Sequence, residues 1–161
     1  MGKLVIVRND SVEGTDTHPV SGSGTAPNGA TVAYAGAASF AYRGRVTQQL
    51  SDFVRVNGAP LAVKSSRSAL NPGETAAGGG HAAASGGGFV PPSPTPIPNT
   101  LKIDAEIGEG RPSATAGSRF VSAGGSPVLL DGDPFDTCGP AAGAANSTVD
   151  AVTQNFISCS E

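Results

Sequence analysis

The chain has 161 residues, enough for one domain, but only 38% of them are hydrophobic, 5% are aromatic and none is tryptophan. Its formal net charge is −3, and no stretch combines clustered Arg and Lys with aromatic residues, which argues against nucleic acid as a partner. With so few large apolar side chains we expect a thin core, reinforced by a metal ion, a disulfide or a partner protein.

The N-terminus carries a short apolar run at residues 4–7, which predicts a first strand. The run is too short for the core of a signal peptide, and no segment has the length of apolar sequence that a membrane span needs. We therefore expect the protein to be cytoplasmic when it is made, with its two cysteines reduced.

The next region predicts a polar turn segment followed by strands. Residues 9–28 are polar and contain Asp16-Thr17-His18-Pro19, and Pro27-Asn28-Gly29 is typical of a hairpin turn. Residues 30–46 predict two strands.

A hairpin pattern then occurs twice, at residues 53–63 and 120–133. Each copy predicts a strand, a two-residue turn and a second strand, with Asn57-Gly58 and Gly124-Gly125 as the turns. Both pairs tolerate the positive φ angles that such turns require. The recurrence predicts an internally repeated β architecture.

The remaining segments differ in composition. Residues 65–100 form a Gly/Pro-rich arm, which is either a linker or an ordered arm that wraps the domain or a partner. Residues 101–107 predict a strand. From Ser147 onward, apolar residues at helical spacing predict a short C-terminal helix: Val149, Val152, Phe156 and Ile157.

The only histidines and cysteines of the chain are candidate metal ligands: His18, His81, Cys138 and Cys159. Imidazole and thiolate both suit Zn²⁺, and four such ligands complete a tetrahedral site. Ordinary alternatives stay open, namely solvated turn histidines, a buried thiol, and a disulfide between the cysteines.

Other patterns give weaker hypotheses. Asp131, Asp133 and Asp136 have part of the spacing of a calcium loop, but no Glu follows at the twelfth position, so a polar turn is favoured. Neither histidine lies in a hydrolase motif, and the glycine runs lack the Lys-Ser/Thr of a phosphate loop. We therefore expect no enzymatic activity.

Several segments resemble PAAR and PAAR-like proteins. The strand-Asn-Gly-x-Pro-strand unit at residues 52–63 is similar to that family's repeating unit, and residues 126–133 with Cys138-Gly139 resemble its closing unit. Asp16-Thr17-His18 resembles its early Asp-x-x-His turn, and residues 71–80 resemble the Gly-rich insertion of the PAAR-like branch. The chain departs from the family pattern by having only two histidines and Pro60-Leu61-Ala62-Val63 in place of Pro-Ala-Ala-Arg.

This resemblance implies one mostly β domain over residues 1–161, a small cone of β-hairpins with pseudo-three-fold repetition. It also implies a structural tip protein that caps and sharpens the trimeric β-helical spike of a contractile injection system, one tip per trimer, with an apex stapled by zinc. Such machines include type VI secretion systems and extracellular phage-tail-like particles. The tip would be assembled into the particle, contact the target membrane transiently, and then be secreted or delivered to a target cell. A cargo effector is a further partner that the Gly/Pro-rich arm could tether.

Two other readings stay open at this point. One is a soluble zinc-stapled β binding module or secreted effector that is not attached to a spike. The other is a fibre-like structural segment of a phage particle. The metal content and the stoichiometry with a spike protein distinguish the three.

Overall fold

The computed structural model describes residues 2–25, 29–72, 97–103, 109–137 and 146–160, and this part of the chain is built from strands and contains no helix. The predicted mostly β class with internal repetition is confirmed. The described residues also contain no helix long and apolar enough to cross a membrane.

The strands are β1 Lys3–Leu4, β2 Ser11–Thr25, β3 Thr31–Gln48, β4 Arg55–Val56, β5 Ala59–Pro60, β6 Arg67–Leu70, β7 Ile97–Ile103, β8 Glu109–Pro112, β9 Ser122–Ala123, β10 Ser126–Pro127, β11 Pro134–Asp136, β12 Ser147–Asp150 and β13 Ser158–Cys159.

Six of these strands form a closed sheet in the order β12-β11-β8-β6-β3-β2, because β12 also pairs with β2. The sheet consists of three antiparallel pairs, β2–β3, β6–β8 and β11–β12, joined side by side. Closure leaves no unpaired edge at this level of the molecule. The interior is narrow: a Cβ on Gly44 would lie 2.6 Å from the carbonyl oxygen of Ala69.

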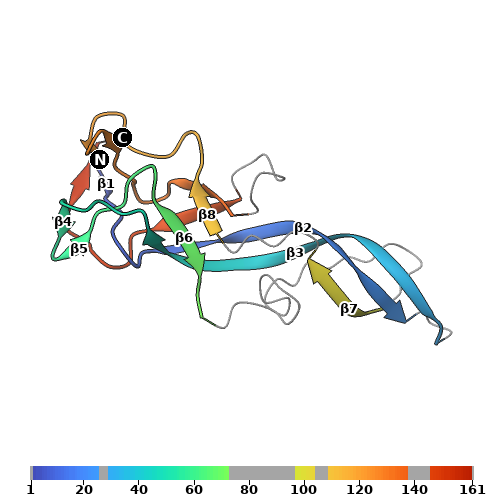
Figure 1. Cartoon of the computed structure of the whole chain (residues 1–161). Helices are drawn as coiled ribbons and strands as arrows, with labels where there is room; N and C mark the ends of the chain where they lie inside the picture. The colour runs from blue at the N-terminus through green and yellow to red at the C-terminus, as the bar shows by residue number, and fades with distance from the viewer. Residues whose placement is uncertain (1, 26–28, 73–96, 104–108, 138–145, 161) are drawn as a thin grey trace.

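β2 and β3 continue far beyond the closed sheet as one long hairpin, in unbroken register from Ser11↔Arg45 to Thr25↔Thr31. β7 pairs with the distal half of β2. Figure 1 shows this hairpin pointing away from the two chain ends. The predicted hairpin is confirmed by the pairing of Thr25 with Thr31, although residues 26–28 of its turn lie outside the described residues. The predicted polar turn at 9–28 and the division of 30–46 into two strands are wrong, because the pairing between β2 and β3 compensates for the polar residues of β2.

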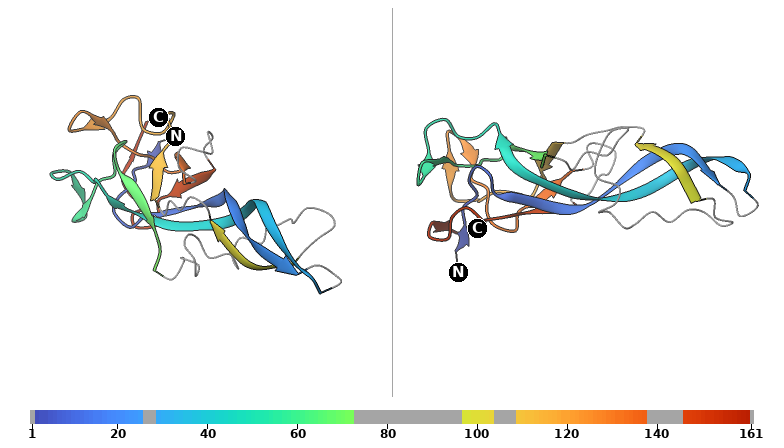
Figure 2. Two further views of the ribbon diagram at one scale, coloured as in Figure 1. Left: turned by 45° about the vertical axis from the view of Figure 1, so that its right-hand side comes forward. Right: turned by 90° about the horizontal axis from the view of Figure 1, so that it is seen from below.

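Three two-stranded hairpins lie at the opposite end: β4–β5, β9–β10 and β1–β13 (Figures 1 and 2). The first two have the predicted turns, with φ angles of 50° and 82° at Asn57 and Gly58 and of 60° and 78° at Gly124 and Gly125. The third is formed by the two termini of the chain. We call this end of the molecule the base.

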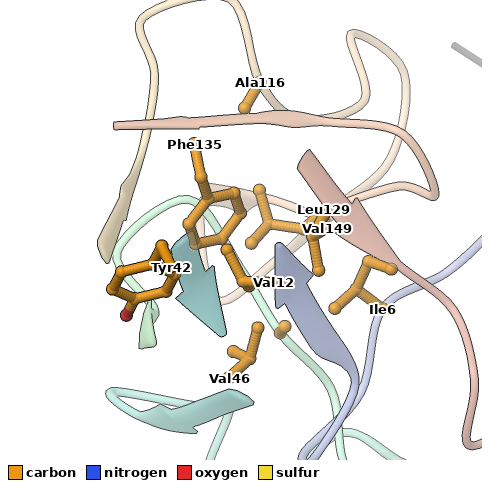
Figure 3. Packing of buried hydrophobic residues seen from close by; sticks show 9 residues of the cluster. Ile6, Val12, Tyr42, Val46, Ala116, Leu129, Phe135 and Val149 are labelled. Carbon is orange, nitrogen blue, oxygen red and sulfur yellow. The ribbon is translucent and has the colours of Figure 1, made fainter. Parts of the chain in front are cut away.

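The core has two clusters. The larger one fills the closed sheet, where Tyr42, Phe135, Ile6 and Leu129 are fully buried (Figure 3). The smaller one lies toward the base and is made of Val5, Val7, Leu61, Val128 and Leu130. The predicted thin core is thereby confirmed, because few large side chains are buried.

The C-terminal segment differs from the prediction of a helix. It forms β12 and β13, and within β12 burial alternates, with Ser147 and Val149 buried and their neighbours exposed. Val152 and Phe156 are exposed rather than packed on one helix face. The helical spacing was coincidental, since pairing with β2 and β11 determines the local conformation. β6 and β7 lie at the two ends of the predicted arm, and residues 73–96 lie outside the described residues.

Candidate docking surface

The centre of the molecule is a ring of three short chain segments at residues 5–7, 61–63 and 128–130. Ile6 N donates to Leu129 O at 2.9 Å, Leu129 N to Ala62 O at 3.1 Å, and Ala62 N to Ile6 O at 2.8 Å. Each segment therefore donates to one neighbour and accepts from the other. This cyclic order is the signature of a pseudo-three-fold axis through a single chain.

The bonds around this ring repeat in the same order. Three isolated bridges join the flanking residues, and three further backbone bonds join each segment to the hairpin that precedes the next one. The bridges are Val5↔Leu130, Val7↔Leu61 and Val63↔Val128, and the further bonds are Arg8 N to Pro60 O, Lys64 N to Pro127 O and Asp131 N to Leu4 O. The three repeats thus share one backbone frame.

A buried polar residue closes the turn after each segment. Asp10 Oδ2 accepts from Val7 N at 2.8 Å, and Asp133 Oδ2 accepts from Leu130 N at 2.8 Å. In the remaining repeat, Ser66 Oγ accepts from Val63 N at 2.9 Å. The polar turn predicted around Asp131 and Asp133 is therefore confirmed, and its carboxylates bind backbone N–H groups.

A second set of equivalent residues begins the chain segment that leads to each base hairpin. Ser51 Oγ accepts from Val54 N, Ser118 Oγ accepts from the N–H groups of the second and third residues after it, and Gln154 Oε1 does the same. In each repeat the second residue after the cap is phenylalanine. These residues are Phe53, Phe120 and Phe156, and we call them the base ring.

The base ring is exposed to solvent. Phe53 is 70% exposed, Phe120 77% and Phe156 54%. The ring of Phe53 lies against the turn of the neighbouring hairpin, since a Cβ on Gly124 would be 3.2 Å from two of its carbon atoms. The residues that follow Phe120 and Phe156, Val121 and Ile157, are 39% and 43% exposed. The base therefore presents three exposed phenylalanines at equivalent places of the three repeats.

The charges around the base ring do not follow the three-fold pattern. The residue before each phenylalanine is Asp52, Arg119 and Asn155 in turn, which are acidic, basic and neutral. The frame is therefore repeated more strictly in its backbone and its apolar side chains than in its charge.

Two charged groups of the frame lie close to each other, the buried Asp133 and the partly buried Lys64. Burial raises the pKa of Asp133, opposed by the N–H groups of Leu130 and Gly117 and by nearby lysines. Burial lowers the pKa of Lys64, opposed by Asp133. Lys64 Nζ donates to the carbonyl oxygens of Ser113 and Ala116, which connects the segment before β9 to the central ring at residues 61–63. Both groups serve the frame that supports the base ring.

Only two of the four predicted zinc ligands, His18 and Cys159, lie among the described residues. Among these residues no group of three or more His, Cys, Asp or Glu could hold a metal ion. His18 lies in β2 opposite Ala38, seven residues beyond Ser11 or roughly 23 Å of extended strand, whereas Cys159 is a free thiol in β13 that packs on the base cluster. His81 and Cys138 lie outside the described residues.

Comparison of the chain with protein-family models, with curated proteins and with solved structures found no match in any of the three.

Sequence reasoning found two of the three repeats and missed the third, because that repeat is divided between the two ends of the chain. A signal was present in the sequence. Ser51-Asp-Phe-Val and Ser118-Arg-Phe-Val match each other, and Gln154-Asn-Phe-Ile keeps the polar cap, the phenylalanine and the β-branched residue.

Proposed function

We propose that this chain is a tip protein that caps the blunt end of a trimeric β-helical spike in a contractile injection system, one copy per trimer. The base contacts the spike, and the projecting β2–β3 hairpin points away from it. Contraction of the sheath drives the spike, and the rigid tip concentrates the force on a small area of membrane. The role is structural rather than enzymatic, and the resemblance adds a cargo effector as a further possible partner.

The observation that carries this proposal is the cyclic ring of backbone bonds among Ile6, Leu129 and Ala62. A single asymmetric chain fits the end of a three-fold object best when it repeats its own geometry three times about one axis. The three base hairpins provide this repetition. They can therefore match three identical subunits over one continuous surface, which a stable interface needs.

Stiffness is the second requirement of a tip, and the ring meets it. Ile6, Ala62 and Leu129 are fully buried, and every backbone N–H of these three residues is bonded within the ring. The closed sheet above the ring has no unpaired edge along its six strands.

Zinc is a separate part of the proposal. The resemblance implies one ion, with His18, His81, Cys138 and Cys159 as ligands. Of these, His18 lies in the projecting β2–β3 hairpin and Cys159 in β13 at the base, and the other two lie outside the described residues. We therefore assign no mechanical step to the metal. Metal analysis of the purified chain and of Cys159→Ser tests this part, with equal zinc content expected; loss of zinc in the variant would contradict the separation of the two residues.

The test of the main proposal is a binding experiment with the trimeric β-helical spike protein of a contractile injection system from the same organism. The two purified proteins are mixed and examined by native mass spectrometry and electron microscopy. We expect one chain per spike trimer, located at the end of the spike. Absence of a complex, or three chains per trimer, would refute the proposal.

A further inference from the structure

We propose that the base ring provides the anchors of the spike contact: Phe53, Phe120 and Phe156 each enter one of three identical apolar pockets on the partner. The partner is a three-fold symmetric protein whose end presents the same pocket on every subunit. This inference rests on the proposed function and adds the residues and the chemistry of the contact.

The first argument is the equivalence of the three phenylalanines. Each is the second residue after a capping side chain, and the residue after it accepts a backbone bond from a core segment: Leu61 N to Val54 O, Val128 N to Val121 O and Val5 N to Ile157 O. A single exposed phenylalanine needs no explanation, but three at the same place of a repeated frame do. Half of the six phenylalanines of the chain are used in this way.

The second argument is the area that the rings offer. At exposures of 70%, 77% and 54% they present together roughly 400 Å² of apolar surface. This is about half of the ~800 Å² that each partner contributes to a stable interface. The three base hairpins, β4–β5, β9–β10 and β1–β13, supply the rest of the interface area. Exposed aromatic anchors of this kind carry a large share of the binding energy in such contacts.

The third argument concerns charge. A partner with three identical subunits presents the same group beside each pocket, whereas this chain presents Asp52, Arg119 and Asn155. A charge on the partner that attracts Arg119 therefore repels Asp52. These terms oppose each other, so net electrostatic attraction is small and the apolar rings dominate. Binding is consequently weakly dependent on salt.

The same symmetry gives three equivalent orientations. Rotation of the chain by one third of a turn exchanges the three rings among three identical pockets and leaves the energy unchanged. A structure of the complex solved without imposed symmetry therefore contains the base of the chain in three superposed orientations. The projecting β2–β3 hairpin, which occurs once, distinguishes them.

The experiment measures the affinity of the intact chain for the purified spike trimer by biolayer interferometry. Each of Phe53→Ala, Phe120→Ala and Phe156→Ala is expected to weaken binding roughly 10- to 100-fold, and the three losses to be similar to one another. The triple variant is expected to lose detectable binding. The matched control is Val152→Ala, because Val152 is 61% exposed but lies outside the base ring.

The outcomes separate this inference from the proposed function. If the unmodified chain binds no trimer, the proposed function fails, and the inference with it. If the unmodified chain binds and the alanine variants bind equally well, or only one phenylalanine matters, the inference alone fails. A change in affinity above about 3-fold between ~50 and ~500 mM salt also overturns it.

Two further measurements exclude indirect effects. The unfolding temperature of each free variant should equal that of the unmodified chain, since the phenylalanine side chains are exposed. A variant that unfolds at a lower temperature would show that its phenylalanine stabilises the fold, and would overturn the role of that residue as an anchor. Sedimentation of the free chain tests the other occupant of the base, a second copy. A dimer that Phe120→Ala dissociates would refute the three-fold partner.

Discussion

Replacement of Asp10 by asparagine tests the frame most directly. Asp10 is fully buried, and its two carboxylate oxygens accept three backbone bonds: from Val7 N at 2.8 Å, Val152 N at 2.9 Å and Thr153 N at 2.7 Å. One side chain thus joins the first core segment to the segment that follows β12. Asparagine has the same shape, but one of its two terminal atoms is a donor and faces an N–H group.

The magnitude follows from these contacts. A hydrogen bond to a charged group contributes about 1.5–3 kcal/mol, and a buried donor without a partner costs about 1–3 kcal/mol more. We expect Asp10→Asn to reduce the free energy of unfolding by about 3 kcal/mol, since at least one bond is lost and another donor is left facing a donor. At this chain length that corresponds to a decrease of about 6–12 °C in the unfolding temperature.

The assay is urea unfolding followed by circular dichroism and by tyrosine fluorescence, because the chain has two tyrosines and no tryptophan and Tyr42 is fully buried. Asp52→Asn, at an exposed position, is the control and should change stability by less than about 0.5 kcal/mol. Ser66→Ala, at the equivalent position of the second repeat, should cost about 1–2 kcal/mol, because a neutral hydroxyl makes fewer and weaker bonds. Equal stability of Asp10→Asn and the unmodified chain would refute this account of the turn caps.

Burial, and then the charges of Asp131 and Glu13, raise the pKa of Asp150. The folded chain therefore binds this proton more tightly than the unfolded chain, and stability falls as the pH rises from the ordinary value through the raised one; Asp150→Asn should flatten that part of a plot of unfolding midpoint against pH, and an unchanged slope would contradict the assignment. In Gly58→Ala the added Cβ would have no atom within 4 Å, but residue 58 keeps a φ of 82°. Calorimetry should therefore give a decrease of about 1–2 kcal/mol in the free energy of unfolding, from backbone strain alone. Gly44→Ala places a Cβ against backbone and should cost more than Gly58→Ala, the reverse order being evidence against the narrow interior. A circular permutant that joins the chain ends by a short loop and opens the β4–β5 turn should keep the circular dichroism spectrum of the unmodified chain, because β1–β13 and β4–β5 are equivalent hairpins.

The turns were the most predictable part of this fold. Asn57-Gly58 and Gly124-Gly125 specify positive φ angles locally, and the structure has them. The strand β2 was not predictable in this way, since its polar residues are typical of a turn and its pairing with β3, β7 and β12 makes it a strand. Local sequence does not show partners that lie far away along the chain.

The base was only partly predictable. The hairpins at residues 53–63 and 120–133, which carry Phe53 and Phe120, were predicted from their turns. Phe156 was assigned to a helix face, because its repeat is completed only by β1 at the other end of the chain. The zinc site stays a prediction from residue types alone, since two of its four residues, His81 and Cys138, lie outside the described residues.

The ring at the centre of the molecule also constrains how the protein folds. Its bonds join residues 6, 62 and 129, and the first strand of the chain pairs with the last, Lys3 with Cys159. A chain whose central contacts span nearly its whole length has a high contact order and folds slowly. During synthesis β1 has to wait for β13 to leave the ribosome, so this domain completes its core only after residue 159 has emerged.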